Sequence, residues 1–171
     1  FGGGFGAGDV PAALDRIVTT SDGLIVADNQ TATAFDFDTP GLTDVYFGAI
    51  GSVSYTGTLT PSGTSYRLGG GGGTLTLNSA LTPTYSLDVK SGTLQLNGFD
   101  ATVSSLSGST DAVLENGHAS TPITVTANQS SDTTFLGAIN DGGAASTKLV
   151  KSGSGDLSLR GGSDFTGGVE I

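Results

Sequence analysis

The chain has 171 residues, of which 29 are Gly and only 13% are charged, and its formal net charge is −10. Because Glu, Lys and Arg are scarce, a helical architecture is disfavoured, whereas Val, Ile, Leu and Phe interleaved with Thr and Ser suit half-buried strands. The acidity and the spread of the six basic residues argue against nucleic-acid and anionic-lipid partners. We therefore expect an all-β protein that binds neither.

Further classes are excluded by what the sequence lacks. It has no Cys, so neither a disulfide framework nor a thiolate metal site is possible. No apolar run approaches the roughly 20 residues that a membrane-spanning helix needs. The chain starts at Phe1 without a signal-peptide pattern and stops inside the strand-like run 168–171. We therefore expect an excerpt of a longer protein.

The N-terminal part of the chain, 1–72, predicts short strands without a clear repeat. Residues 1–8 are Gly-rich and predict a flexible lead-in. Residues 9–18 allow one helical turn capped by Asp9, although their Ile-Val-Thr-Thr end suits a strand better. Consecutive short strands are then expected at 23–29, 33–39, 44–50 and 52–60. The glycines of 69–73 predict a sharp corner or a thin loop.

From residue 73 onward, a repeat of about 20 residues organises the chain. A first series of strand cores lies at 74–78, 93–97, 112–116, 135–140 and 156–160. A second series lies between them, at 86–89, 103–106, 123–126, 148–150 and 168–171. Two series that advance in step are typical of a solenoid in which each turn, or rung, adds one strand to each of two parallel sheets, with further strands possible between.

These patterns predict a parallel β-solenoid of roughly eight rungs, forming part of a longer coil. We divide it into the lead-in 1–8, less regular rungs over 9–72, and regular rungs over 73–171 that continue the preceding part. Its structural partners would be the neighbouring rungs of the same parent chain, because an uncovered sheet edge invites further pairing.

Asparagine closes four of the strand cores, and Gly follows two of these residues directly. The four are Asn78, Asn97, Asn116 and Asn140. Stacked Asn side chains can hydrogen-bond from rung to rung, and Asn tolerates the left-handed backbone of a tight corner. The alternative is an antiparallel sheet with Asn-Gly hairpin turns. We favour the ladder, because a two-residue hairpin would place the next strand immediately after Asn-Gly.

Register gives one conflict. When the rungs are aligned on their Asn residues, Glu115 falls where Leu77 and Leu96 lie. Either this rung slips by one residue or Glu115 points outward, and the sequence leaves both alternatives open.

Catalytic chemistry has little to build on. His118 is the only histidine, so a Ser-His-Asp triad or a histidine-based metal site would depend on it alone. It follows Asn116-Gly117, and we interpret it as a solvent-exposed loop residue. The glycines of 69–73 are not followed by the Lys-Ser/Thr of a phosphate loop. The sequence therefore indicates no enzyme, no catalytic residue and no cofactor-binding residue.

Calcium remains an alternative interpretation of one segment. Asp36, Asp38 and Gly41 begin like a calcium loop but lack its later bidentate Glu, and Phe35 and Phe37 alternate with the two Asp as on a strand. We favour a solvated strand face there and assign no metal site. Together with Asp44, the same carboxylates would be the weak basis of a polysaccharide-degrading enzyme.

The aromatic residues allow two interpretations. Those considered are Tyr46, Phe47, Tyr55, Tyr66, Tyr85 and Phe99. On one outer face they would form a sugar-binding strip, whereas inside the coil they would stack as core residues.

The C-terminal segment carries a family resemblance. Residues 151–171 run Lys-Ser-Gly-Ser-Gly-Asp-Leu-Ser-Leu, then a Gly-containing loop with Phe165, then Thr-Gly-Gly before a β-branched strand. This run closely resembles the autotransporter-associated β-strand repeat of bacterial passenger domains. Residues 90–99 resemble a shorter copy, and 66–75 resemble a glycine corner of similar surface proteins. The resemblance covers 66–171 well and 1–65 only by composition.

The resemblance implies a right-handed parallel β-helix that is exported from a Gram-negative-type bacterium and displayed or released at its surface. Its expected role is that of a stalk or scaffold supporting adhesion, biofilm or fibre formation. The alternative is a glycan- or host-protein-binding module on a β-helix, and a polysaccharide-degrading β-helix is a more distant one.

Overall fold

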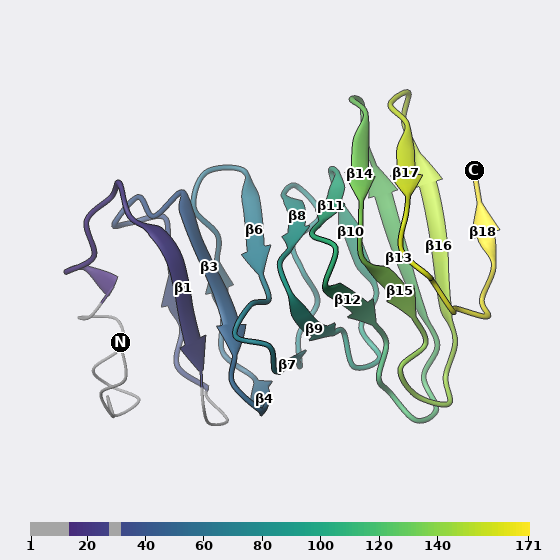
Figure 1. Ribbon diagram of the computed structural model, residues 1–171, viewed down its shortest axis with the longest axis horizontal. Helices are drawn as coiled ribbons and strands as arrows, with labels where there is room; N and C mark the ends of the chain where they lie inside the picture. The colour runs from purple at the N-terminus through teal and green to yellow at the C-terminus, as the bar shows by residue number, and fades with distance from the viewer. Residues whose placement is uncertain (1–13, 28–31) are drawn as a thin grey trace.

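The computed structural model describes residues 14–27 and 32–171, and every named regular element in them is a β-strand. All strand pairs formed by these elements are parallel. The strands stack side by side from β1 to β18 along the long axis of the molecule (Figure 1). The described chain is therefore a β-solenoid, which confirms the predicted fold class. The hairpin alternative is wrong.

Each turn of the coil visits three faces. The first face is a seven-stranded sheet of β1 (Asp22–Ala27), β3 (Asp44–Ala49), β6 (Ser65–Leu68), β8 (Ser86–Val89), β11 (Leu106–Gly108), β14 (Thr133–Phe135) and β17 (Leu157–Leu159). The second face is a five-stranded sheet of β4 (Ser52–Tyr55), β7 (Thr74–Leu77), β9 (Gly92–Gln95), β12 (Ala112–Glu115) and β15 (Ala138–Asn140).

The third position in each turn is taken by two smaller sheets. Early in the chain it holds the pair β2 (Phe35–Asp36) and β5 (Leu59–Thr60), and later the sheet β10 (Ala101–Val103), β13 (Ile123–Asn128), β16 (Thr147–Ser152) and β18 (Val169–Glu170). The two predicted series therefore merged separate faces. The second series contains β8 of the first face together with β13, β16 and β18.

Turn length explains the remaining errors in the repeat. In the middle of the coil, Leu87 is the register partner of both Tyr66 and Leu106, whereas further on Phe135 is the partner of Gly108 and Leu159. A constant period of about 20 residues placed β17 in the first predicted series, together with β7, β9 and β12 of the second face. Because the later turns are longer than this period, β17 lies on the first face instead. Seven strands on the first face give about six turns, so the predicted count of roughly eight was too high.

The N-terminal predictions hold in part. The strands expected at 23–29, 33–39 and 44–50 correspond to β1, β2 and β3, and the run 52–60 divides into β4 and β5. The Ile-Val-Thr-Thr segment is not a strand, because Ile17 and Ser21 donate backbone hydrogen bonds to Leu14 and Val18 in successive turns. The lead-in 1–8, the Asp9 cap and residues 28–29 of the first expected strand lie outside the described residues.

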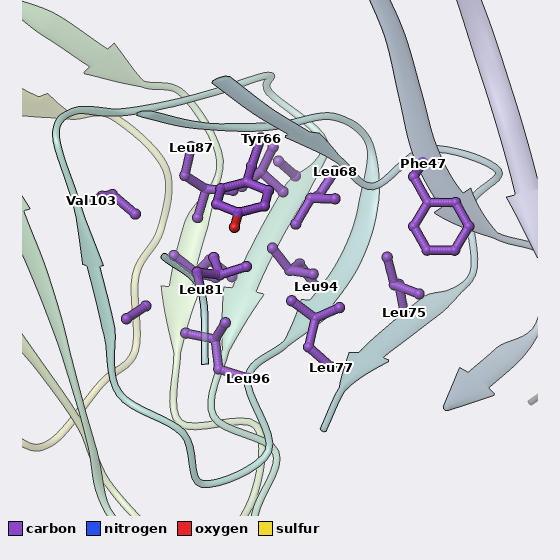
Figure 2. Packing of buried hydrophobic residues seen from close by; sticks show 14 of the residues in the cluster. Phe47, Tyr66, Leu68, Leu75, Leu77, Leu81, Leu87, Leu94, Leu96 and Val103 are labelled. Atoms are coloured by element: carbon purple, nitrogen blue, oxygen red, sulfur yellow. The ribbon is translucent and has the colours of Figure 1, made fainter. Parts of the chain in front are cut away.

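The core is a set of ladders made by alternate residues of each strand. Leu75, Leu94 and Leu114 occupy one register position in β7, β9 and β12, and all three are fully buried. Figure 2 shows Leu75, Leu77, Leu94 and Leu96 gathered between the faces of the coil. Each leucine of a ladder rests on the one in the next rung, so apolar burial and the backbone hydrogen bonds both run along the axis.

The asparagine ladder exists only at its first step. Asn97 Nδ2 donates to Asn78 Oδ1 at 2.8 Å, and Asn97 adopts the left-handed backbone expected of a corner, with φ of 47°. The ladder stops there because the next rung slips by one residue: Leu114 pairs with Leu94 and Glu115 with Gln95. The prediction that Asn116 and Asn140 continue the ladder was therefore wrong.

The slip also answers the question of Glu115. Its side chain points outward and Glu115 Oε1 accepts a hydrogen bond from Gln95 Nε2 at 2.6 Å, while Gln95 Oε1 accepts one from Thr76 at 2.9 Å. Asn116 takes the inward position of Leu96 and is fully buried. The rung therefore slips by one residue and Glu115 also points outward, so both alternatives that the sequence left open are correct.

At some glycines the close packing of rungs leaves no room for a side chain. A Cβ on Gly161 would lie 1.9 Å from the carbonyl oxygen of Gly137, whereas one on Gly162 would meet no atom within 4 Å. We expect Gly161→Ala to lower the free energy of unfolding by about 1–3 kcal/mol, since backbone must move, and Gly162→Ala to change it by less than about 0.5 kcal/mol. Denaturant titration of the two variants measures the contrast, and equal stabilities would refute this account of rung packing.

Candidate functional site

The structure gives His118 a local role. Its Nδ1 accepts hydrogen bonds from the backbone N–H groups of Ser120 at 3.2 Å and Thr121 at 2.9 Å. Because Nδ1 is an acceptor, the neutral ring carries its proton on Nε2. The ring is half-buried rather than solvent-exposed as predicted, because it turns back onto its own loop. This geometry organises the loop and does not resemble a triad, in which Nδ1 donates to a carboxylate.

The Asp36 carboxylate accepts hydrogen bonds from residues of its own turn. Asp36 Oδ1 accepts from the N–H groups of Asp38 and Thr39, and Asp36 Oδ2 accepts from the Thr39 hydroxyl at 2.6 Å. The Thr39 hydroxyl, assisted by these two N–H groups, holds the pKa of Asp36 below its ordinary value despite partial desolvation. The described residues contain no group of three or more His, Cys, Asp or Glu placed to hold a metal ion.

The aromatic residues do not form an outer strip. Phe47, Tyr55 and Tyr66 are buried, and Tyr85 packs edge-on against Tyr66 with ring centroids 5.3 Å apart. Tyr46, in β3, and Tyr85 are partly buried, and Phe99, in a loop, is exposed. Of the two interpretations, the core interpretation is therefore correct for Phe47, Tyr55 and Tyr66, and the six residues do not share one outer face.

The glycine-rich corner joins two faces of the coil, and one interior cavity in the described part of the chain is too small for a ligand. Gly69 to Gly72 all have positive φ and connect the first face to the second. A cavity of about 10 Å³ lies among Phe37, Leu42, Tyr66 and Leu68. A space of that size accepts one water molecule at most.

One polar cluster was not found from the sequence. One outer surface carries Tyr46 of β3, Arg67 of β6, Asp88 of β8 and Lys90, which directly follows β8; we call these residues the Tyr46 cluster. The pairing of Phe47 with Leu68 sets Tyr46 beside Arg67, and Arg67 pairs with Asp88. Lys90 follows two residues after Asp88 and so lies on the same side. The equal spacing of Tyr46, Arg67 and Asp88 along the chain was the available signal.

Tyr46 organises this cluster with both ends of its side chain. Its hydroxyl donates to Asp88 Oδ2, and the ammonium of Lys90 lies 4.4 Å from the centroid of its ring. Ser107 donates a second hydrogen bond to Asp88 Oδ1 at 3.0 Å. Burial, followed by the hydrogen bond to Asp88 and its charge, raises the pKa of Tyr46 to about 12, so the hydroxyl stays a donor at neutral pH.

A recurring polar contact ties successive rungs together. A side-chain oxygen of Asp or Asn accepts the backbone N–H of a residue in the following turn. The pairs are Asp38 with Gly63, Asp100 with Thr124, Asp132 with Asp156, Asn140 with Asp164, and Asp141 with Thr166. We call these contacts rung clasps. Ionised oxygens accept hydrogen bonds more strongly than neutral ones, so the clasps made by Asp depend on pH.

Asp141 offers the sharpest test of the clasps. Desolvation alone would raise its pKa, but hydrogen bonds from Thr147 N–H and from the hydroxyl and N–H of Thr166 outweigh it and hold the pKa of Asp141 below its ordinary value. The carboxylate therefore stabilises the fold fully above its unfolded-state pKa of about 3.9, and this contribution is lost as the pH falls through the lowered folded-state pKa.

We expect the melting temperature of the wild type to decrease as the pH is lowered below about 4. Asp141→Asn is expected to make this decrease smaller and to lower the melting temperature at pH 7. Asp111→Asn is the control, because the Asp111 side chain is exposed and makes no hydrogen bond or ion pair within the described part of the chain. Melting curves from pH 3 to 7, monitored by circular dichroism, give the comparison. Parallel pH profiles for wild type and Asp141→Asn would contradict the role of the clasp.

Within residues 14–27 and 32–171, no helix is long and apolar enough to cross a membrane. Comparison with protein-family models, with curated proteins and with solved structures found no match for this chain.

Proposed function

We propose that the chain is a non-catalytic stalk or scaffold segment of a secreted or surface-displayed protein of a Gram-negative-type bacterium. The observation that carries the proposal is the stacking of parallel strands along one axis, which is continuous on the first face from β1 to β17 (Figure 1). Its buried ladders and rung clasps repeat in the axial direction, so stiffness and length come directly from adding turns. The resemblance of residues 151–171 to autotransporter-associated repeats supports the location at the cell surface.

A structural role also agrees with how the polar residues are used. His118 and Asp36 satisfy backbone N–H groups of their own turns, and Asp141 joins two rungs. These are the residue types from which a hydrolytic site would be built, and here each is engaged in holding the coil. We therefore infer that the coil supports adhesion, biofilm or fibre formation rather than turnover of a substrate.

The test is electron microscopy of the full-length protein on intact cells, with an antibody to this segment. Labelled rods or fibres that project from the cell surface are the expected result. Compact surface label or intracellular label would overturn the proposal. Cells that lack the gene provide the control for antibody specificity.

A further inference from the structure

The corner between β9 and β10 contains Asn97 and Gly98, and its backbone suits these two residue types. Asn97 has φ of 47° and Gly98 has φ of 84°. Asn is one of the few residues that tolerate this left-handed region, and Gly enters it without strain. A Cβ on Gly98 would also lie 3.2 Å from side-chain atoms of His118 and Thr121, closer than an ordinary van der Waals contact. The geometry of the corner therefore favours the dipeptide Asn-Gly.

An Asn-Gly dipeptide has the groups for a reaction with its own backbone. The amide nitrogen of Gly98 would lose its proton to water, and its electron pair would attack Cγ of Asn97 to form a five-membered succinimide. The side-chain NH2 group takes up a proton and leaves as ammonia. Water then adds to one of the two imide carbonyls and opens the ring, which leaves either aspartate or isoaspartate. The reaction consumes water and needs no other reagent.

The structure holds the nucleophile of this reaction in a hydrogen bond. Gly98 N–H donates to Oδ1 of Asn116 in the next turn at 2.9 Å, and the backbone oxygen of Asn116 accepts Asn97 N–H at 2.7 Å. Asn116 is fully buried, and its Nδ2 donates to the carbonyl oxygens of Thr121 and Ala145, which fixes the direction of Oδ1. The Gly98 nitrogen therefore becomes reactive only when this contact opens.

The leaving group of Asn97 belongs to the partial asparagine ladder. Asn97 Nδ2 donates to Asn78 Oδ1, and Asn78 Nδ2 in turn donates to Ser54 Oγ at 2.7 Å. Because Asn78 is oriented by that second bond, a carboxylate at position 97 would bring two acceptors together. Isoaspartate would in addition lengthen the main chain of the corner by a methylene group. Either product is expected to weaken the contact between these rungs.

The second Asn-Gly dipeptide of the described chain, Asn116 with Gly117, is held more firmly. Gly117 N–H donates to the backbone oxygen of Asp141 at 2.9 Å, whereas Gly98 N–H depends on a side chain. Asn116 is also fully buried, whereas Asn97 is only half-buried. Of the two, Asn97 is therefore the one expected to react in the folded protein.

We propose that Asn97 is a site of slow spontaneous deamidation, and that Asn116 of the following turn sets its rate by holding Gly98 N–H. Asn116 is a protecting residue in this scheme, because it touches the nucleophile and takes no part in the bonds that form and break. The inference goes beyond the stalk function and does not depend on it, since it assigns the coil a chemical ageing reaction at a named corner.

The experiment follows deamidation of the full-length protein at mildly alkaline pH, both folded and in concentrated urea. Mass spectrometry of peptides measures the replacement of NH2 by OH at Asn97 and at Asn116, and enzymatic methylation detects isoaspartate. Folded wild type is expected to react about tenfold or more slowly than the unfolded chain at Asn97, because the corner must first open, and more slowly still at Asn116. Equal rates at Asn97 in the folded and unfolded chains, or faster reaction at Asn116 than at Asn97 in the folded protein, would overturn the proposal.

Two variants separate the local contact from global stability. Asn116→Leu removes the acceptor of Gly98 N–H, so deamidation of Asn97 in the folded state is expected to rise about fivefold or more. Phe47→Ala is the control, because it destabilises the early turns and leaves that contact in place, and less than about a twofold rise is expected. Circular dichroism verifies that both variants are folded at the temperature used. Equal acceleration in the two would show that Asn116 does not protect Asn97.

The wild type gives a further test that requires no substitution. Hydrogen exchange of Gly98 N–H reports the opening of its bond to Asn116. As urea is raised below the unfolding transition, this exchange and the deamidation of Asn97 are expected to increase in proportion. Deamidation that stays constant while the exchange of Gly98 increases would contradict the proposed control by Asn116.

Discussion

Replacing Phe47 by Ala is expected to lower the free energy of unfolding by about 3–5 kcal/mol. Phe47 is 1% exposed and its ring centroid lies 4.7 Å from that of Phe35 and 5.2 Å from that of Tyr55. The side chain fills the interior where the early turns meet, so its removal leaves a cavity that the stacked strands around it cannot close. Denaturant titration of the purified protein, followed by far-ultraviolet circular dichroism, measures the loss.

Phe99→Ala is the matched control, because it deletes the same side chain at a position that is 39% exposed. We expect it to cost less than about 1 kcal/mol. If the two variants lost equal stability, the aromatic cluster of Phe35, Phe37, Phe47 and Tyr55 would not be the core of the early turns.

Asn116→Leu is the second substitution with a large expected effect, and the pattern of neighbouring rungs would make it look conservative. Leu96 occupies the same inward position one rung earlier. Asn116 Nδ2, however, donates to the carbonyl oxygens of Thr121 at 2.8 Å and Ala145 at 3.2 Å, and its Oδ1 accepts from Gly98 N–H at 2.9 Å. A leucine satisfies none of these groups.

We expect Asn116→Leu to lower the free energy of unfolding by about 2–4 kcal/mol, since each buried polar group left without a partner costs about 1–3 kcal/mol. The comparison is Asn78→Ala at the half-buried end of the partial ladder, where the expected loss is about 1 kcal/mol. Equal or greater stability of Asn116→Leu, measured by denaturant titration, would show that apolar filling outweighs the hydrogen bonds.

Much of the fold follows from alternation in the sequence. The Leu pairs of 74–78 and 93–97 predicted one buried side for each strand, and Leu75 and Leu94 do stack there. What alternation does not give is register between rungs. Aligning on Asn rather than on Leu placed Glu115 at a core position, whereas the structure aligns Leu114 with Leu94. An inward Asn and a corner Asn look alike in the sequence, because the difference lies in the hydrogen bonds of neighbouring loops.

The number of faces was missed because turn length varies along the coil. The turn that joins Arg67 to Asp88 is shorter than the turns after β11. A constant period of about 20 residues hides the third face and places distant residues in false series. Arg67 and Lys90 look scattered in the sequence because neighbours across rungs are far apart in the chain.

The rung clasps give the coil a mechanical direction. Each clasp and each backbone ladder bond lies between one turn and the next, so a pull on the two ends of the chain loads these bonds one turn at a time. A turn like the one that Asp132 and Asp156 close, once peeled away, releases up to about 80 Å of extended chain. Under tension the coil is therefore expected to unfold one turn at a time, in steps of similar length, while the turns that the unfolding has not reached stay folded.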